Sequence, residues 1–297
     1  MLRIIADSTC DISKEDARKM GIQIVPISVR FGNEEFLDGV EITHEEFYTR
    51  LAECDELPKT SQPSPDTFMK VFNEAVAAGD DVLGIFISSD LSGTYQSACL
   101  AALDVEEETG NKLYMVDSRS ASIGTALLIR EAVKLRDAGV NAADIAAACT
   151  EMSKYIKLTA VVGSLKYLKM GGRLSGAAAF AGTMLHITPV VSIEDGKVVV
   201  IGKTRGKKAA EKLMHDKLTK DGLSLTRDFM FGHINCSESL ETFINKSLTY
   251  ISDVNGNVCV SSIGCSVGTH VGPGTYGIAY VEAAESGMNR ESIVKTA

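Results

Sequence analysis

The first half of the chain alternates short β-rich runs with helical patterns, and this alternation restricts the possible folds more than any other feature. Several helical segments carry end signals: Thr43 with Glu46 forms a capping box, and Pro65 stands in a first helical turn. The predicted strands or extended runs lie at 2–6, 22–31, 81–87 and 112–117, and the predicted helices at 13–20, 43–53, 64–79, 92–104, 122–139 and 141–156. Strands that alternate with helices imply a parallel α/β sheet, so we predict a Rossmann-like N-terminal domain.

The second half of the chain has a different pattern. Within residues 188–205, Asp195-Gly196 stands between two β-rich runs, and this dipeptide is a hairpin signal. A hairpin and adjacent strands favour a mixed or antiparallel sheet. We therefore predict two α/β domains, residues 1–157 and residues 158–297.

Composition excludes several classes of function. The 297 residues carry a net charge of −9 with no long basic run, so non-specific binding to nucleic acid or to an anionic membrane is not expected. The N-terminus reaches Asp7 too soon for a signal peptide, and no apolar stretch approaches the length of a membrane span. Seven cysteines without a Cys-x-x-Cys motif indicate a reducing cytoplasm, with no disulfide framework and no metal site. Cys10 is the one candidate for a reactive thiol.

Hydroxyl side chains gather in SSDLSGTYQSA, residues 88–98, directly after a predicted strand. In open α/β sheets ligands bind at this end of the strands, and the N-terminus of the following helix favours an anion. Ser92 could serve only as an N-cap, but Ser92-Gly93-Thr94 offers two hydroxyls around a glycine that permits close approach. No histidine lies between His44 and His186, so these hydroxyls have no nearby base. They are therefore better suited to hold an anion than to attack a carbonyl.

Two further segments offer ligand-binding groups. The proline-stiffened loop LPKTSQPSP contains Thr60, Ser61 and Ser64, of which Ser64 could simply cap the next helix. MGGRLSG offers Arg173 as a partner for an anion, and the small-residue run 176–185 could border a narrow apolar cavity or pack against a neighbouring helix.

The segment GCSVG, residues 264–268, matches the nucleophile elbow of serine hydrolases. That elbow needs a helix after the serine, and the following THVGPGTYG is not predicted to form one. Only His270 comes later, and no aspartate follows Asp253. A serine acyl-hydrolase therefore stays an alternative, as does a phosphate-handling protein, although both phosphate-binding glycine motifs, Walker and Rossmann, are absent.

Six segments in order resemble the DegV family of fatty-acid-binding proteins over nearly the whole chain. They are ADSTCD, KTSQPSP, SSDLSGTYQSA, VDSRSAS, LKYLKMGGRLSG and TPVVSIEDGKV. The resemblance implies two α/β domains with one long-chain fatty acid between them. It also implies that Thr60 and Ser92 bind the carboxyl group, within a site that includes Ser61, Gly93, Thr94 and His270.

Some members of that family present the fatty acid to a fatty acid kinase, which makes an acyl-phosphate. For those members a surface aspartate and two arginines are implicated, together with a histidine of the C-terminal domain. The matching residues here are Asp38, Arg173, Arg205 and His270. The resemblance thus implies a lipid carrier that is not an enzyme on its own, needs no cofactor or metal, and has a fatty acid as its ligand.

Overall fold

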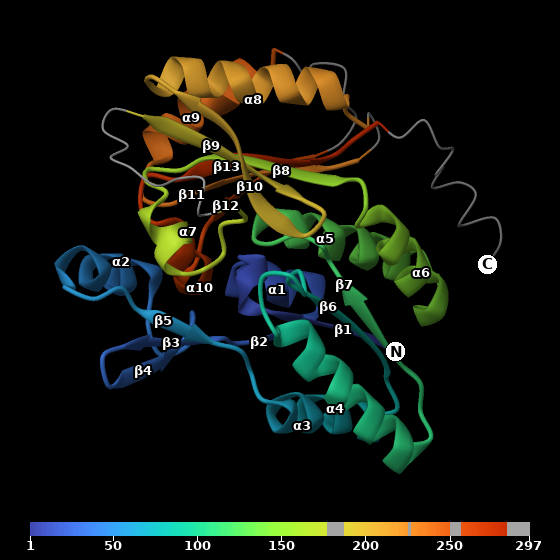
Figure 1. The fold of residues 1–297 in the computed structure, drawn as a ribbon. Coiled ribbons are helices and arrows are strands. Elements are labelled where there is room, and N and C mark those ends of the chain that lie inside the picture. The colour runs from blue at the N-terminus through green and yellow to red at the C-terminus, as the bar shows by residue number, and fades with distance from the viewer. Residues whose placement is uncertain (177–186, 225–226, 250–256, 284–297) are drawn as a thin grey trace.

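The computed structural model describes residues 1–176, 187–224, 227–249 and 257–283. Figure 1 shows two layered halves, the first from the N-terminal part of the chain and the second from the C-terminal part. The elements of the first half are β1 (Leu2–Asp7), the 3-10 helix η1 (Ser8–Cys10), α1 (Lys14–Met20), β2 (Ile22–Val25), β3 (Ser28–Phe31), β4 (Glu34–Leu37), α2 (His44–Glu53), β5 (Lys59–Ser61), α3 (Pro65–Ala77), β6 (Asp81–Phe86), α4 (Thr94–Thr109), β7 (Leu113–Asp117), α5 (Ile123–Asp137) and α6 (Ala142–Met152). Those of the second half are β8 (Ile156–Val161), α7 (Lys166–Met170), β9 (Thr188–Glu194), β10 (Lys197–Thr204), α8 (Lys207–Asp221), β11 (Phe229–His233), α9 (Ser237–Ser247), β12 (Val258–Ser262), α10 (Cys265–Val271) and β13 (Tyr276–Val281).

The N-terminal sheet confirms the predicted parallel α/β arrangement. Its four strands run in the order β2-β1-β6-β7, and every neighbouring pair is parallel. Helices α3 and α4 pack together on one face, while α5 and α6 pack against the other. The predicted helix signals are present as well: Thr43 and Glu46 form the capping box of α2, and Pro65 opens α3.

A small antiparallel sheet, in the order β4-β3-β5, was not predicted. The run 22–31 was expected to be one extended segment, but it is split between β2 of the parallel sheet and β3 of the small sheet. The segment around Thr60 was expected to be a loop, and this expectation is wrong because Thr60 lies on β5 opposite Val29. A strand fixes the backbone of Thr60 more firmly than a loop would.

The second half contains a six-stranded mixed sheet in the order β10-β9-β8-β13-β11-β12, as the sequence indicated. Among the described strands of this sheet, only β11 and β12 pair in parallel. The predicted hairpin joins β9 to β10, and both turn residues, Asp195 and Gly196, have positive φ, as a two-residue hairpin turn requires. The predicted boundary after residue 157 falls inside β8, so the second sheet begins at Ile156.

Helix α5 lies between the two large sheets. Eleven of its fifteen residues are buried, because it packs against the parallel sheet on one side and against β8, β11 and β13 on the other. Residues of both sheets consequently belong to one hydrophobic cluster, which includes Ile4 and Leu83 of the first and Leu158 and Val191 of the second. Helices α8 and α9 cover the opposite face of the second sheet, at the top of Figure 1. None of the helices in the described ranges is both long enough and apolar enough to span a membrane.

Helix α10 directly follows β12 and corrects a second expectation, because the segment after GCSVG was not predicted to be helical. Its sequence, CSVGTHV, has poor intrinsic helix propensity. Two buried carboxylates fix its start: Asp38 accepts hydrogen bonds from the N–H groups of Cys265 and Ser266, and Asp11 accepts one from Gly264. Tertiary contacts therefore overrule local propensity here.

Candidate ligand-binding site

A cavity of about 300 Å³ lies between the N-terminal and C-terminal domains. Its walls come from β5, the turn before α4, the segment after α7, and α10. Thr60, Ser61, Ser92, Arg173 and His270 supply polar side chains to the lining. The structure therefore brings together four residues predicted to bind the ligand and Arg173, which the sequence offered both as a partner for an anion and as part of a surface for a kinase.

Ser92 belongs to the turn that connects β6 to α4, at the end of a parallel strand where the sequence placed it. Its Oγ lies 2.9 Å from Oγ1 of Thr94, and the Thr94 N–H donates to it over 3.3 Å. Thr94 is fully buried and is not part of the cavity lining, so its hydroxyl contacts Ser92 rather than the cavity. Because α4 begins at Thr94, the first N–H groups of that helix lack intrahelical acceptors and add positive potential beside Ser92.

Gly93 is the N-cap residue of α4 and contacts the side chain of Gln62. A Cβ at position 93 would lie 2.1 Å from Oε1 of Gln62, which is too close for any other residue type without rearrangement. Gln62 in turn donates to Oγ of Ser97 over 2.8 Å and lines the cavity. The absence of a side chain at Gly93 thus permits the turn that carries Ser92 to approach the segment after β5 that carries Gln62.

Thr60 and His270 form a contact across the two domains. Oγ1 of Thr60 lies 2.9 Å from Nε2 of His270. Burial, together with the positive charge of Arg173, lowers the pKa of His270 to about 4, so the imidazole is neutral near pH 7. Its Nδ1 is buried and has no hydrogen-bond partner among the described residues.

Arg173 follows α7 and supplies the positive charge of the cavity. Its Nε donates to the carbonyl of Leu91 over 3.1 Å, and Nη1 donates to the carbonyl of Gly171 over 2.6 Å. These bonds hold the guanidinium at the cavity wall. Within the described residues it forms no ion pair with a carboxylate, so its charge is available to an anionic ligand.

A second cavity, of about 70 Å³, adjoins the first. Four residues, Ala121, Val198, Val267 and Val271, line both cavities. The rest of its lining is mainly apolar and comes largely from the inner face of the second sheet, with Leu158, Val191 and Ile193 among its members. The polar end of the site therefore leads into an apolar interior.

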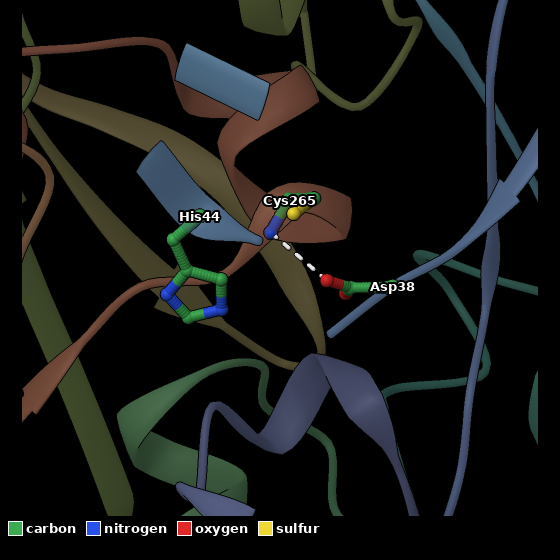
Figure 2. Close-up of side chains that lie close together, drawn as sticks. All are labelled: Asp38, His44 and Cys265. Carbon is green, nitrogen blue, oxygen red and sulfur yellow. Dashed lines mark hydrogen bonds between the residues drawn. The ribbon is translucent and has the colours of Figure 1, made fainter. Parts of the chain in front are cut away.

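Asp38 and Arg205 do not lie at the cavity. The resemblance implied a surface aspartate, but this location is wrong for Asp38, whose side chain is only 4% exposed. Figure 2 shows it against the start of α10, where it accepts the N–H of Cys265. Arg205 is exposed and lies directly after β10. The run 176–185 lies outside the described residues except for Gly176.

Ser266 was not singled out as a site residue, although GCSVG pointed to it. It lies on α10 one turn before His270 and lines the cavity. The strand, turn and helix of a nucleophile elbow are thus present, but Ser266 lacks the strained backbone of such a serine, since it is not among the residues with positive φ. In the described part of the chain no acid orients His270 through Nδ1, as a catalytic triad requires.

Cys10 is not the reactive thiol that the sequence suggested. Its side chain is buried, and burial together with the negative charge of Asp7 raises the pKa of the thiol well above its usual value. A thiol that stays protonated is a poor nucleophile.

Comparison with known proteins assigns the chain to a family. The model of the DegV family, described as an uncharacterised protein family, matches residues 1–283. A DegV domain-containing protein of Clostridium perfringens is 34% identical over 281 residues, which cover 95% of this chain and 98% of that protein.

Solved structures show the same fold. A DegV-family protein of Thermus thermophilus, described by its fatty acid binding, is 32% identical with a TM-score of 0.85, and the match covers 94% of this chain and 99% of that one. A stearic acid-binding protein of Eubacterium ventriosum is 29% identical with a TM-score of 0.81, and the match covers 95% of this chain and 98% of that one. The chain therefore belongs to the DegV family.

Proposed function

We propose that this protein binds a long-chain fatty acid between its two domains, with the carboxyl group held at the polar end of the larger cavity. The observation that carries the proposal is the polarity of the site: hydroxyls and one arginine gather at one end, and apolar side chains line the other. A phosphate would need no apolar extension, whereas a fatty acid needs both parts. The fatty acid binding described for the relatives from Thermus thermophilus and Eubacterium ventriosum supports the same ligand class.

The head group is bound by donors from both domains. Thr60 and Ser92 present hydroxyls from the N-terminal domain, while Arg173 presents its charge from the C-terminal domain. If Nε2 of the neutral His270 carries the ring proton, it donates to Oγ1 of Thr60, and the Thr60 hydroxyl hydrogen is then free to donate to the carboxylate. A buried carboxylate requires such donors, because an unpaired charge is costly to remove from water.

The tail extends into the apolar cavity between α10 and the second sheet. Each buried methylene contributes up to ~0.8 kcal/mol, so a chain of roughly 14 to 20 carbons offers on the order of 10 kcal/mol before ordering costs. Such a ligand should survive purification. The test is mass spectrometry of an organic extract of the purified protein, followed by calorimetric titration of the delipidated protein with palmitate. Extracts without fatty acid, together with no binding on titration, would overturn the proposal.

We propose further that the protein is a carrier that presents the fatty acid to a fatty acid kinase, rather than an enzyme on its own. The support is that, among the residues the structure describes, no acid orients His270, and that Arg205 is exposed outside the cavity. The competing hydrolase would form a covalent acyl-serine at Ser92 or Ser266. Intact-mass analysis after incubation with an activated ester distinguishes the two, because a carrier shows no adduct that turns over.

A further inference from the structure

Three residues with metal-binding side chains converge away from the ligand cavity. Asp38 follows β4, His44 is the first residue of α2, and Cys265 is the first residue of α10. One ligand atom of each lies within 4.8 Å of the other two (Figure 2). Asp38 and Cys265 are buried, while His44 is half-buried and can adjust its side chain.

The carboxylate of Asp38 is held in place by three donors. Its Oδ1 accepts from the N–H of Cys265 over 3.2 Å, and its Oδ2 accepts from the N–H of Ser266 and the hydroxyl of Ser8, each over 3.1 Å. A carboxylate oxygen has about two acceptor sites, so Oδ1 can still take a further ligand. The three donors therefore fix the position of the Asp38 carboxylate, and its Oδ1 can still accept a metal ion.

The space around Gly264 shows that these groups face one another. A Cβ on Gly264 would lie 3.0 Å from Nε2 of His44, 3.1 Å from Oδ1 of Asp11 and 3.4 Å from Oδ1 of Asp38. Two carboxyl groups and an imidazole thus surround a single glycine. Neither Asp11 nor Asp38 pairs with a lysine or arginine among the described residues, although their side chains are only 5% and 4% exposed. Burial raises the pKa of Asp11 well above its usual value, so this carboxyl group favours its neutral form. The buried carboxylate of Asp38 without a counter-cation is costly, and a bound divalent cation would compensate it.

We propose that Asp38, His44 and Cys265 form a zinc site that joins α2 of the N-terminal domain to α10 of the C-terminal domain. Zn²⁺ accepts this mixed set of oxygen, nitrogen and sulfur ligands, whereas Mg²⁺ and Ca²⁺ prefer oxygen alone. A water would complete a tetrahedral shell. Tetrahedral zinc ligands lie about 3.3–3.8 Å apart, so movement of roughly 1 Å, mainly by His44, closes the site.

Binding would convert the Cys265 thiol to a thiolate and release its proton to solvent. The sequence had predicted no metal site, because it contains no Cys-x-x-Cys motif and His233 and Cys236 have no second pair. The three ligands proposed here lie in separate segments of the chain, so local spacing could not indicate them.

The test uses the full chain, stripped with a chelator and then titrated with Zn²⁺ in competition with a chromophoric chelator. Co²⁺ serves as a spectroscopic substitute, because a thiolate ligand gives it a charge-transfer absorption band. The variants are His44→Gln and Cys265→Ser, and the matched control is His233→Gln. His233 is also next to a cysteine, since its Nδ1 lies 3.5 Å from the N–H of Cys236.

We expect one Zn²⁺ per chain in the wild type and in His233→Gln. Loss of even an outer-shell partner weakens zinc binding about 10-fold or more, so His44→Gln should lose at least that much. Cys265→Ser should remove the Co²⁺ charge-transfer band. A wild type without tight Zn²⁺ binding, equal weakening in His44→Gln and His233→Gln, or a band that persists in Cys265→Ser would each overturn the proposal. If Cys265→Ser does not fold, the half-exposed His44→Gln variant decides the question by itself.

Discussion

Nε2 of His270 lies 2.9 Å from Oγ1 of Thr60, although the two residues are 210 positions apart and belong to different domains. The contact places a neutral imidazole beside a hydroxyl at the polar end of the cavity, with Arg173 in the same wall. Neither domain alone contains this arrangement. Docking of the domains therefore creates the polar end of the cavity.

The depressed pKa of His270 predicts a pH dependence of stability in the lipid-free protein. The unfolded chain binds a proton near pH 6.5, whereas the folded protein does so only near 4. Between these values the unfolded state holds more protons, so stability falls as pH falls from 6.5 towards 4. Relative to His270→Gln, the wild type should lose up to about 3 kcal/mol across this window. Urea unfolding of both proteins at several pH values measures the difference. If the free energy of unfolding depended on pH in the same way in both proteins, the prediction would be contradicted.

Ser92→Ala should weaken fatty-acid binding roughly 10-fold or more, because a hydrogen bond to a charged group contributes about 1.5–3 kcal/mol. A fatty alcohol of equal length should lose less affinity, since it carries no charge. The matched control is Ser89→Ala, which alters the same turn at a residue that is not part of the cavity lining. Titration calorimetry measures all three proteins. Equal effects of the two substitutions would show that Ser92 does not bind the carboxyl group.

Val191→Phe should shorten the fatty acids that the protein accepts. Val191 lines the smaller, apolar cavity and not the polar end, so a larger side chain there occupies space for the tail alone. We expect affinity for palmitate to fall at least 10-fold while a ten-carbon acid binds as before. The substitution should also cost about 1–3 kcal/mol of stability, as overpacking usually does. An equal loss of affinity for palmitate and for the ten-carbon acid would mean that the tail does not lie beside Val191.

Arg205→Ala should leave lipid binding unchanged and impair phosphorylation of the bound fatty acid by a cognate kinase. Arg205 is exposed outside the cavity, and an arginine is suited to bind an anionic phosphate. Arg173→Gln provides the contrast, because Arg173 lines the cavity and its loss should weaken lipid binding as well. Binding is measured by calorimetry and transfer by a coupled kinase assay. If Arg205→Ala lost lipid binding to the same extent as phosphorylation, Arg205 would not act on the kinase step alone and the prediction would be refuted.

Asp38→Ala should lower the free energy of unfolding by about 2–4 kcal/mol, because it leaves three donors, from Ser8, Cys265 and Ser266, without their acceptor. The measurement is made by urea unfolding in the presence of a chelator, so that bound metal plays no part. Glu41→Ala is the control. Glu41 is exposed, and from the described residues its side chain accepts only the N–H of Leu37, over 2.9 Å, so its loss should cost less than about 1 kcal/mol. Similar losses in the two variants would mean that the capping of α10 contributes little.

Local signals in the sequence were sufficient to predict most of the long helices and strands, and to single out the two hydroxyl-rich segments around Thr60 and Ser92 as candidate binding segments. Period and end signals predicted α2, α3 and the hairpin between β9 and β10, because these features depend on near neighbours in the chain. The small sheet escaped prediction because its strands contain three or four residues and β4 is largely exposed, which leaves no clear alternation.

The composition of the polar end of the cavity depends on contacts between distant segments. Thr60 and Ser92 could be named because each stands in a motif. MGGRLSG suggested Arg173 as a partner for an anion, but nothing local indicates that it faces Thr60 and Ser92. The family resemblance implied that Asp38 lies at the surface, where most charged residues lie. It is buried because α10 and Ser8 supply the donors that a buried carboxylate requires, and those donors lie far away in the sequence.

The position of helix α5 between the two large sheets has a consequence for how the protein unfolds. One side of α5 packs against the N-terminal sheet and the other side against the C-terminal sheet. If either sheet unfolds, α5 loses its packing on that side, and its packing against the remaining sheet is weakened as well. The two domains are therefore not independent folding units, despite their separate sheets. Heating should produce a single cooperative transition instead of two, and a calorimetric enthalpy equal to the van't Hoff enthalpy would be its signature.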